Sequence, residues 1–338
     1  MDWGSSYSAT WRVFRVNRNT WADGQALEDI DVVSISRTGD GSLLESGNMQ
    51  LSGDFESDYY RIVMTAEQGG ELTRVDVGTL LFDTTGGDED YGSTSYNVNG
   101  LSVLHPASTT AVTIGEYAPA GVDGAQYAKA LLESAINAPV VVEGGFILNE
   151  HVVHELGSTI LNAAWGVLEA GNFVIQIDGR GVVYIRPKPT QPALILSNQT
   201  SAQLFNGIEF NADMSQIPNR YVVIDGNTIT VAENNDPTSI VSTVSRGYNV
   251  DVIDTSPTPV NSETYSEYAN RMLKQSSILK EERTYTREYA PDVYPYSLVK
   301  ASVAGMSGNF RVDSQTITCG YGITVNEKAS KETQLWLT

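Results

Sequence analysis

The sequence predicts a mainly β protein with a small α+β region in its middle. Short runs that alternate polar and apolar residues, separated by Gly- and Asp-rich turns, fill the first part of the chain and resume after residue 200. Between them, two stretches carry apolar residues at the spacing of a helix face. We therefore expect three regions, at residues 1–112, 113–200 and 201–338.

Composition bounds the class of protein. The chain has 338 residues, of which 41% are hydrophobic, enough for buried cores in two or three domains. No apolar run approaches the roughly 20 residues that a membrane-spanning helix needs, so we expect no membrane segment. No secretory signal is visible at the N-terminus. The single cysteine excludes an intramolecular disulfide, which fits a reducing compartment.

The net charge is −20, from 41 acidic and 21 basic residues. Such a charge repels nucleic acid, because binding to its backbone needs clustered Lys and Arg. We expect no sequence-specific nucleic-acid binding. The simpler interpretation of the acidity is solubility, and the alternative is an acidic wall along a conduit through which DNA slides.

The first region reads as successive strands. Gln68-Gly-Gly70 predicts a tight turn, and the acidic run Asp83–Asp90 predicts a loop. Closely spaced strands with such turns are typical of a sandwich or a barrel. The expected strands are Trp11–Val16, Ile30–Ser36, Tyr59–Thr65, Arg74–Phe82 and Ser93–Val103.

The middle region mixes helices and strands. Asp123, with Gln126 three residues on, predicts the start of a helix that ends near Pro139. Ser158 predicts the cap of a second helix, which stops at Gly171. A hairpin should follow, with the sequence Asp178-Gly-Arg-Gly181 at its turn. Further extended segments are expected at Val140–Val142, Phe146–Leu148, Phe173–Ile177 and Val182–Arg186, before a linker at Pro187–Pro192.

The last region returns to strands. One hairpin is expected around Asp225-Gly-Asn227, and a helix should begin at a Ser262 cap. The segment Tyr294–Thr318 contains no residues suited to catalysis. It predicts two strands, Leu298–Val303 and Phe310–Ile317, joined by a turn at Gly305–Gly308.

The three histidines give weak evidence for a metal site. His151 and His154 stand three residues apart and His105 is distant, whereas zinc proteases use His-Glu-x-x-His with the glutamate between the histidines. The segment around the pair favours a strand, in which residues three apart face opposite sides. We assign no metal ligands.

No other motif carries chemistry. The acidic run Asp83–Asp90 lacks the ligand spacing of an EF-hand. Cys319 follows a strand-like run and is expected to fill apolar space rather than act as a nucleophile. The sequence has no Gly-x-Ser-x-Gly elbow and no phosphate-binding glycine loop. We assign no catalytic and no cofactor-binding residues, and expect no cofactor.

Tyrosine is unusually frequent, with 17 residues against 8 Phe and 5 Trp. Tyrosine is common where one end of the side chain is packed and the other stays wet. This pattern occurs at subunit contacts and also in carbohydrate sites, so both interpretations stay open. The tyrosines near predicted strands are Tyr59, Tyr60, Tyr285, Tyr289, Tyr294 and Tyr296.

The order of these elements resembles the tail hub family of phages and related injection machines, including the late control protein D group. The resembling segments span most of the chain. They are the hairpin region Ser34–Leu51, the helix and hairpin from Ser158 to Pro187, the strand Ile217–Ile224, and the helix from Ser262 with the segment Arg283–Thr318.

The resemblance implies two tube-like β-barrel domains, at 1–112 and 201–338, flanking the α+β domain at 113–200. It implies a homotrimeric ring in the virion tail tip, assembled in the bacterial cytoplasm. The ring would join a hexameric tail tube or distal tail protein to a central spike, fibre or tape measure protein. No catalytic residue carries over from this family. The alternatives from other classes are a cytosolic carbohydrate-active protein with a carboxylate pair and tyrosine platforms, and an acidic adhesin-like module.

Overall fold

The structure is a computed structural model and confirms a mainly β protein, with 50% of the chain in strands and 14% in helices. The chain divides into two compact units, residues 1–208 with 284–329, and residues 209–283 with 330–338. The predicted division at residues 112 and 200 stays a prediction. The description omits residues 1–2, 4, 28–29, 40–44, 53–55, 91–92, 114, 198–203, 206, 258, 260–262, 321 and 337–338.

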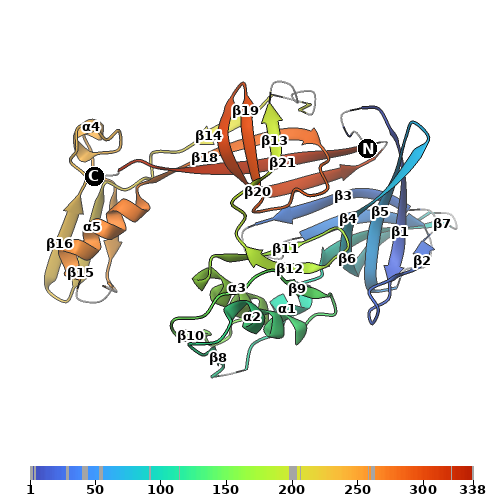
Figure 1. The fold of residues 1–338 in the computed structure, drawn as a ribbon, viewed down its shortest axis with the longest axis horizontal. Helices are drawn as coiled ribbons and strands as arrows, with labels where there is room; N and C mark the ends of the chain where they lie inside the picture. The colour runs from blue at the N-terminus through green and yellow to red at the C-terminus, as the bar shows by residue number, and fades with distance from the viewer. Residues whose placement is uncertain are drawn as a thin grey trace. The chain divides into compact units, whose positions relative to one another are not determined.

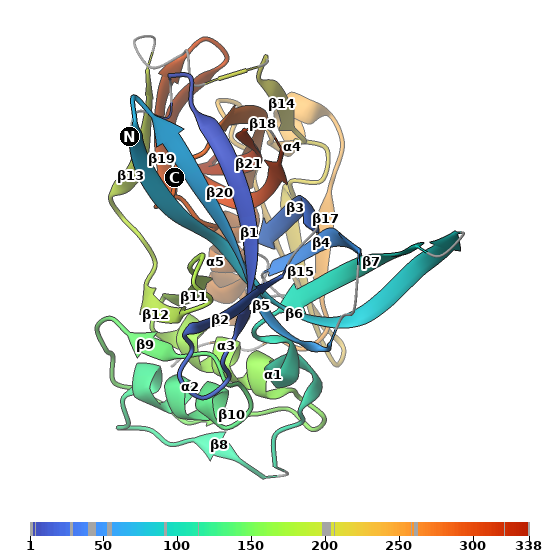
Figure 2. The same ribbon diagram turned by 90° about the vertical axis from the view of Figure 1, so that its right-hand side faces the viewer.

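The first unit is built on one large sheet, ordered β18-β21-β20-β3-β4-β7-β6-β5-β1-β2 (Figures 1 and 2). Apolar residues from β1, β3 to β7, β20 and β21 share one core. The sheet therefore curves around this core. The described strands do not form a closed barrel. The strands are β1 Ser8–Val16, β2 Asp23–Leu27, β3 Ile30–Thr38, β4 Glu45–Ser52, β5 Asp58–Gln68, β6 Glu71–Asp90, β7 Ser93–Ser102, β18 Ile278–Glu288, β20 Met306–Cys319 and β21 Ile323–Gln334.

Two neighbouring hairpins of this sheet, β5–β6 and β6–β7, confirm one prediction and correct another. Gly69 and Gly70 have φ of 61° and 87° and form the two-residue turn between β5 and β6, as Gln68-Gly-Gly70 predicts. The loop predicted at Asp83–Asp90 is wrong. Its backbone continues β6 and pairs with β7 as far as Ser93, because ladder hydrogen bonds outweigh the low strand propensity of Gly and Asp.

The hairpin predicted at Leu298–Ile317 is confirmed, with a tighter turn. Strand β19, Leu298–Val303, pairs with β20 from Met306 onward, so Ala304 and Gly305 alone make the turn. Gly305 has φ of 83°, which suits glycine. Strand β13, Pro192–Ser197, pairs with β19 in parallel. These strands share an apolar core with β18 and β21.

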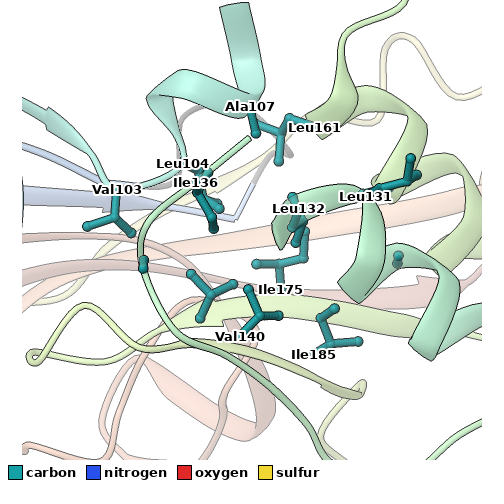
Figure 3. Close-up of a cluster of buried hydrophobic side chains, with 14 of the residues drawn as sticks. Val103, Leu104, Ala107, Leu131, Leu132, Ile136, Val140, Leu161, Ile175 and Ile185 are labelled. Atoms are coloured by element: carbon teal, nitrogen blue, oxygen red, sulfur yellow. The ribbon is translucent and has the colours of Figure 1, made fainter. Parts of the chain in front are cut away.

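The middle region forms a three-stranded sheet, β11-β12-β9, beside three helices (Figure 1). Leu131, Leu132, Leu161, Ile175 and Ile185 meet in its core (Figure 3). The elements are α1 His105–Thr109, β8 Tyr117–Ala118, α2 Gly124–Glu133, β9 Val140–Val142, β10 Val152–Val153, α3 Ile160–Ala170, β11 Phe173–Ile177 and β12 Val183–Pro187.

The predicted caps and segments here are partly confirmed. The Asp123 side chain accepts hydrogen bonds from the main-chain N–H groups of Ala125 and Gln126, so its prediction is confirmed. The Ser158 prediction is wrong by one residue, since Thr159 accepts from the Asn162 N–H. Helix α2 ends at Glu133, before Pro139. Phe146–Leu148 makes a single β-bridge at Ile147 and no strand.

The second unit has a three-stranded sheet, β16-β15-β17, covered on one face by α5. The hairpin predicted at Asp225-Gly-Asn227 is confirmed. Thr264 caps α5 in a capping box with Glu267, whereas the predicted cap Ser262 lies outside the described residues. The elements are β14 Glu209–Ala212, β15 Arg220–Asp225, β16 Thr228–Glu233, α4 Thr243–Arg246, β17 Asp251–Asp254 and α5 Tyr265–Ser276.

Candidate functional site

The predicted metal-like histidines have separate partners. His151 Nδ1 accepts a hydrogen bond from the Ala120 N–H at 3.2 Å, and His154 Nε2 lies 3.3 Å from the Tyr127 hydroxyl. Burial lowers the pKa of His154, which favours the neutral ring. Within the described part of the chain, no three His, Cys, Asp or Glu side chains gather as metal ligands would. The pair therefore holds the β8–β10 region and the start of α2 together.

Cys319 lies at the end of β20 in the core of the large sheet, with 8% of its surface exposed. Burial raises the pKa of its thiol to about 12. Because the thiolate is the nucleophile, this thiol is unreactive in the folded protein.

The tyrosines that the sequence singled out lie mainly inside. Tyr59, Tyr60, Tyr285 and Tyr289 are each at most 4% exposed and belong to the apolar cores, while Tyr294 and Tyr296 are partly exposed. Four of the six thus contribute to folding rather than to a wet surface. Tyr296 instead borders an open cleft.

A buried ion pair joins β18 to β21. The Arg287 guanidinium donates to Glu327 at 2.6 Å, with the two side chains 2% and 0% exposed. Gln315 and the Tyr285 hydroxyl also donate to this carboxylate, at 2.7 and 2.5 Å. Burial and the nearby negative charge raise the pKa of Tyr285 well above its usual value, so it stays a donor. Glu327 is thus a fixed acceptor at the centre of the strands.

A second buried pair lies between β3 and β4. Arg37 Nε donates to Glu45 Oε1 at 2.9 Å, and the second carboxylate oxygen of Glu45 is buried without a partner among the described residues. Burial raises the pKa of Glu45 to about 7, although Arg37 opposes the shift. A cavity of about 10 Å³ adjoins the pair, close to the volume of one water. Gln176 and Pro295, whose hydrogen bond links β11 to the loop before β19, also line this cavity.

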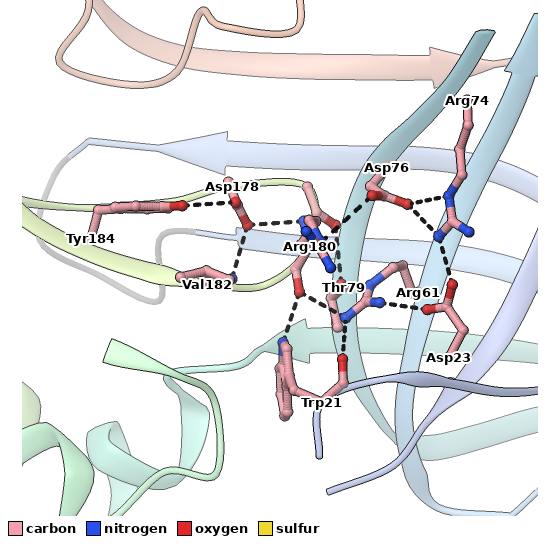
Figure 4. Close-up of polar contacts among 11 residues, drawn as sticks. Trp21, Asp23, Arg61, Arg74, Asp76, Thr79, Asp178, Arg180, Val182 and Tyr184 are labelled. Atoms are coloured by element: carbon pink, nitrogen blue, oxygen red, sulfur yellow. Dashed lines mark hydrogen bonds and ion pairs between the residues drawn. The ribbon is translucent and has the colours of Figure 1, made fainter. Parts of the chain in front are cut away.

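The Asp178-Gly-Arg-Gly181 turn lies against β5 and β6 (Figure 4). Arg61, only 2% exposed, donates to the main-chain carbonyls of Trp21 and Arg180 at 3.1 and 3.0 Å and is ion-paired with Asp23. A Cβ on Gly179 would collide with the Asp76 carbonyl, and one on Gly181 would lie 2.7 Å from Thr79. Both glycines are therefore needed for this close approach.

Two carboxylates beside this turn are ion-paired with arginine. Asp23 and Asp76 both accept from Arg74, at 2.6 and 2.7 Å, and although burial opposes it, the ion pairs hold the pKa of Asp23 below its usual value. Asp178 in the turn instead accepts from the N–H groups of Arg180 and Val182, and burial raises its pKa. Asp23 and Asp76 are both engaged by Arg74, so this pair is not free to act as an acid and a base.

An edge of the large sheet offers another kind of site. Among the described residues, β2 pairs with β1 alone. The outer edge of such a strand carries main-chain N–H and C=O groups that can pair with a strand of another chain. This edge belongs to the first unit.

Sequence reasoning missed every buried charge in these networks. Arg61, Glu327 and Arg37 look like ordinary surface residues of strands, and their partners are up to 119 residues away. The Asp-Gly-Arg-Gly motif was the one usable signal, because two glycines around a short turn indicate a close backbone approach.

Solved structures with a similar fold include tail proteins. The chain is similar to a tail protein from Neisseria meningitidis MC58, with a TM-score of 0.65 and 13% identity over 98% of each chain. It is also similar to the 43 kDa tail protein of prophage MuSo2 from Shewanella oneidensis, with a TM-score of 0.61 and 12% identity over 96% and 98% of the chains. The resemblance to hub proteins is thus confirmed at the level of the fold.

A secretion complex shares the fold over part of its length. The chain matches a protein in the Francisella PdpA-VgrG complex with a TM-score of 0.54 and 7% identity, covering 96% of this chain and about half, 53%, of that one. No family model matches the sequence, and no curated protein matches it significantly. No described helix could span a membrane.

Proposed function

We propose that the chain is a structural component of a phage or prophage tail tip, a baseplate hub. Three copies would form a ring that joins the hexameric tail tube or a distal tail protein to the central spike, fibre or tape measure protein. Each copy would contribute two tube-like β-domains, at 1–112 and 201–338, around the α+β domain. The hub leaves a channel for tape measure and DNA and performs no catalysis.

The observation that carries this proposal is the match to tail proteins over 98% of both chains. A similarity confined to one domain would leave the rest of the chain free for another activity. Here the similarity extends over 98% of both chains at 13% identity, which supports selection for a shape. A match at 13% sequence identity establishes the fold alone, and the role in the tail is our proposal.

The physical features fit a scaffold. The edge of β2 offers β-augmentation between subunits, and the buried ion pairs hold the sheet in one arrangement. A net charge of −20 would repel DNA passing through a channel. The pair of carboxylates at Asp23 and Asp76 does not support the carbohydrate-active alternative, because both are bound to Arg74.

Electron microscopy tests the proposal most directly. The purified chain should form threefold rings with three times the 36.7 kDa chain mass, and gold-labelled antibody should mark the tail tip of virions. Mass photometry over a range of concentrations provides the mass independently. If neither the purified protein nor any tail contains a ring with this chain, the hub assignment is wrong.

A further inference from the structure

An open cleft of about 580 Å³ lies between the α+β part and the loop before β19, within the first unit. Its volume lies in the range of sites that bind ligands. One wall is a single face of α3, formed by Asn162, Trp165, Gly166 and Glu169 at helical spacing. The other lining residues are Gly39, Asn172, Phe173, Val174, Lys188 and Tyr296.

No contact among the described residues explains why position 166 is a glycine. It stands in the middle of the 11-residue helix α3, where glycine is the least favourable residue after proline. A Cβ at this position would meet no atom within 4 Å, in contrast to Gly124 of α2, where it would collide with the Phe146 ring. Gly166 therefore leaves the helix backbone bare toward the cleft, which allows another main chain to approach closely.

Tyr296 is held in a strained conformation at the opposite wall. Its φ of 69° is a rare value for an aromatic residue, and its N–H donates to the Val312 carbonyl at 2.8 Å. This backbone places the Tyr296 ring 6.0 Å from that of Trp165. Strain of this kind persists where the surroundings impose it, and it concentrates at binding sites.

Trp165 also carries an unused donor. Its indole N–H is buried without an acceptor among the described residues. Buried donors are rarely left in this state, and the indole N–H can only donate. An occupant of the cleft that carries a carbonyl oxygen would supply the missing acceptor once the indole turns toward it.

We propose that this cleft binds a short extended peptide segment of another tail protein. The segment's main chain would lie over Gly166, a carbonyl would accept from Trp165, and the amides of Asn162 and Asn172 would pair with further N–H and C=O groups. The inference rests on the proposed tail function.

Binding can be measured on the full chain. The probes are overlapping synthetic peptides that cover the other structural proteins of the same tail, with a soluble chito-oligosaccharide as the saccharide probe. Fluorescence anisotropy of labelled probes gives the affinity. Comparison of wild type with Trp165→Phe shows whether the tryptophan fluorescence change on binding comes from Trp165.

The variant Gly166→Leu fills the cleft beside the helix, and Gly207→Leu is its control, because a Cβ at Gly207 also meets nothing within 4 Å. We expect at least one peptide to bind wild type and Gly207→Leu equally. Gly166→Leu should weaken it about tenfold or more, while the thermal midpoint stays the same or rises.

Three results would overturn the proposal: no peptide binds, Gly166→Leu binds as wild type does, or only the saccharide binds with a Trp165 signal. The hub assignment fails separately. If tails contain rings but no peptide binds, the peptide inference alone is wrong. If no tail contains a ring, the hub assignment is wrong, whatever the result with the peptides.

Discussion

Buried charged side chains of the first unit, such as Arg61 and Glu327, bind charged partners. Glu327 accepts from three side chains, and Arg61 donates to β2, to β6, to the Trp21 carbonyl and to the hairpin turn. Removing water from a charge costs several kcal/mol, which only close partners offset. The individual pairs thus specify which strands lie together more than they add stability.

Replacing Arg287 with methionine should be strongly destabilising. The change leaves Glu327 buried and charged with only neutral donors, so we expect the free energy of unfolding to fall by about 3–5 kcal/mol. Urea denaturation followed by circular dichroism measures this value. The matched control is Lys129→Gln, which breaks an exposed pair with Glu133 and should cost about 0.3–0.5 kcal/mol. Equal losses for both variants would contradict the assignment.

Glu45 should make stability depend on pH. Its pKa is about 7 in the folded chain against 4.5 ordinarily, so between these values the folded state binds more protons than the unfolded state. The free energy of unfolding therefore falls as pH rises from 4.5 to 7, by about 3 kcal/mol. The measurement is the difference between wild type and Glu45→Gln across this range. A difference that is flat or grows with pH would contradict the raised pKa.

At the scale of elements, local patterns were sufficient wherever a turn or cap is encoded by neighbouring residues. The Gly69-Gly70 turn and the Asp123 cap follow from two or three adjacent residues. The predicted loop at Asp83–Asp90 failed, because its pairing with β7 is a property of the sheet. The Ser158 cap failed by one position, since two adjacent hydroxyl residues offer the same chemistry.

The choice between those two hydroxyls can be tested. Thr159→Ala removes the oxygen that accepts from the Asn162 N–H at 3.2 Å and should cost about 1 kcal/mol. Ser158→Ala leaves this bond intact and should change stability by less than about 0.5 kcal/mol. Thermal denaturation of both variants measures the two losses of stability. A larger loss for Ser158→Ala would return the cap to the predicted residue.

At the scale of the whole molecule, the mainly β class and the α+β middle could be predicted from periodicity alone. The attachment of the α+β part could not, because Arg61 is 119 residues from Arg180 and nothing in the sequence pairs it with the Asp178-Gly-Arg-Gly181 turn. Only the folded chain brings the Arg180 carbonyl to Arg61. Whether the strands form two tube-like domains is a property of the assembly.

Arg61→Met should loosen this attachment. The change removes the donor to the Arg180 carbonyl, so the α+β part loses its polar contact with β5, while the Thr79 hydroxyl of β6 still donates to the Gly179 carbonyl. We expect faster hydrogen exchange in residues 124–187, with the large sheet affected less. Arg18→Met, which removes an ion pair half exposed at Arg18, is the control and should leave exchange there unchanged. Uniform exchange changes across both parts would contradict a local role.

Cys319 can report how often the large sheet opens at the end of β20. It is the single cysteine, it lies under the large sheet, and its thiol pKa of about 12 keeps it protonated. A thiol reagent can modify it only after the end of β20 separates from its neighbours. The rate of modification therefore counts openings of the sheet, in the free chain and within a tail, and the ratio of the two rates measures how far assembly suppresses them.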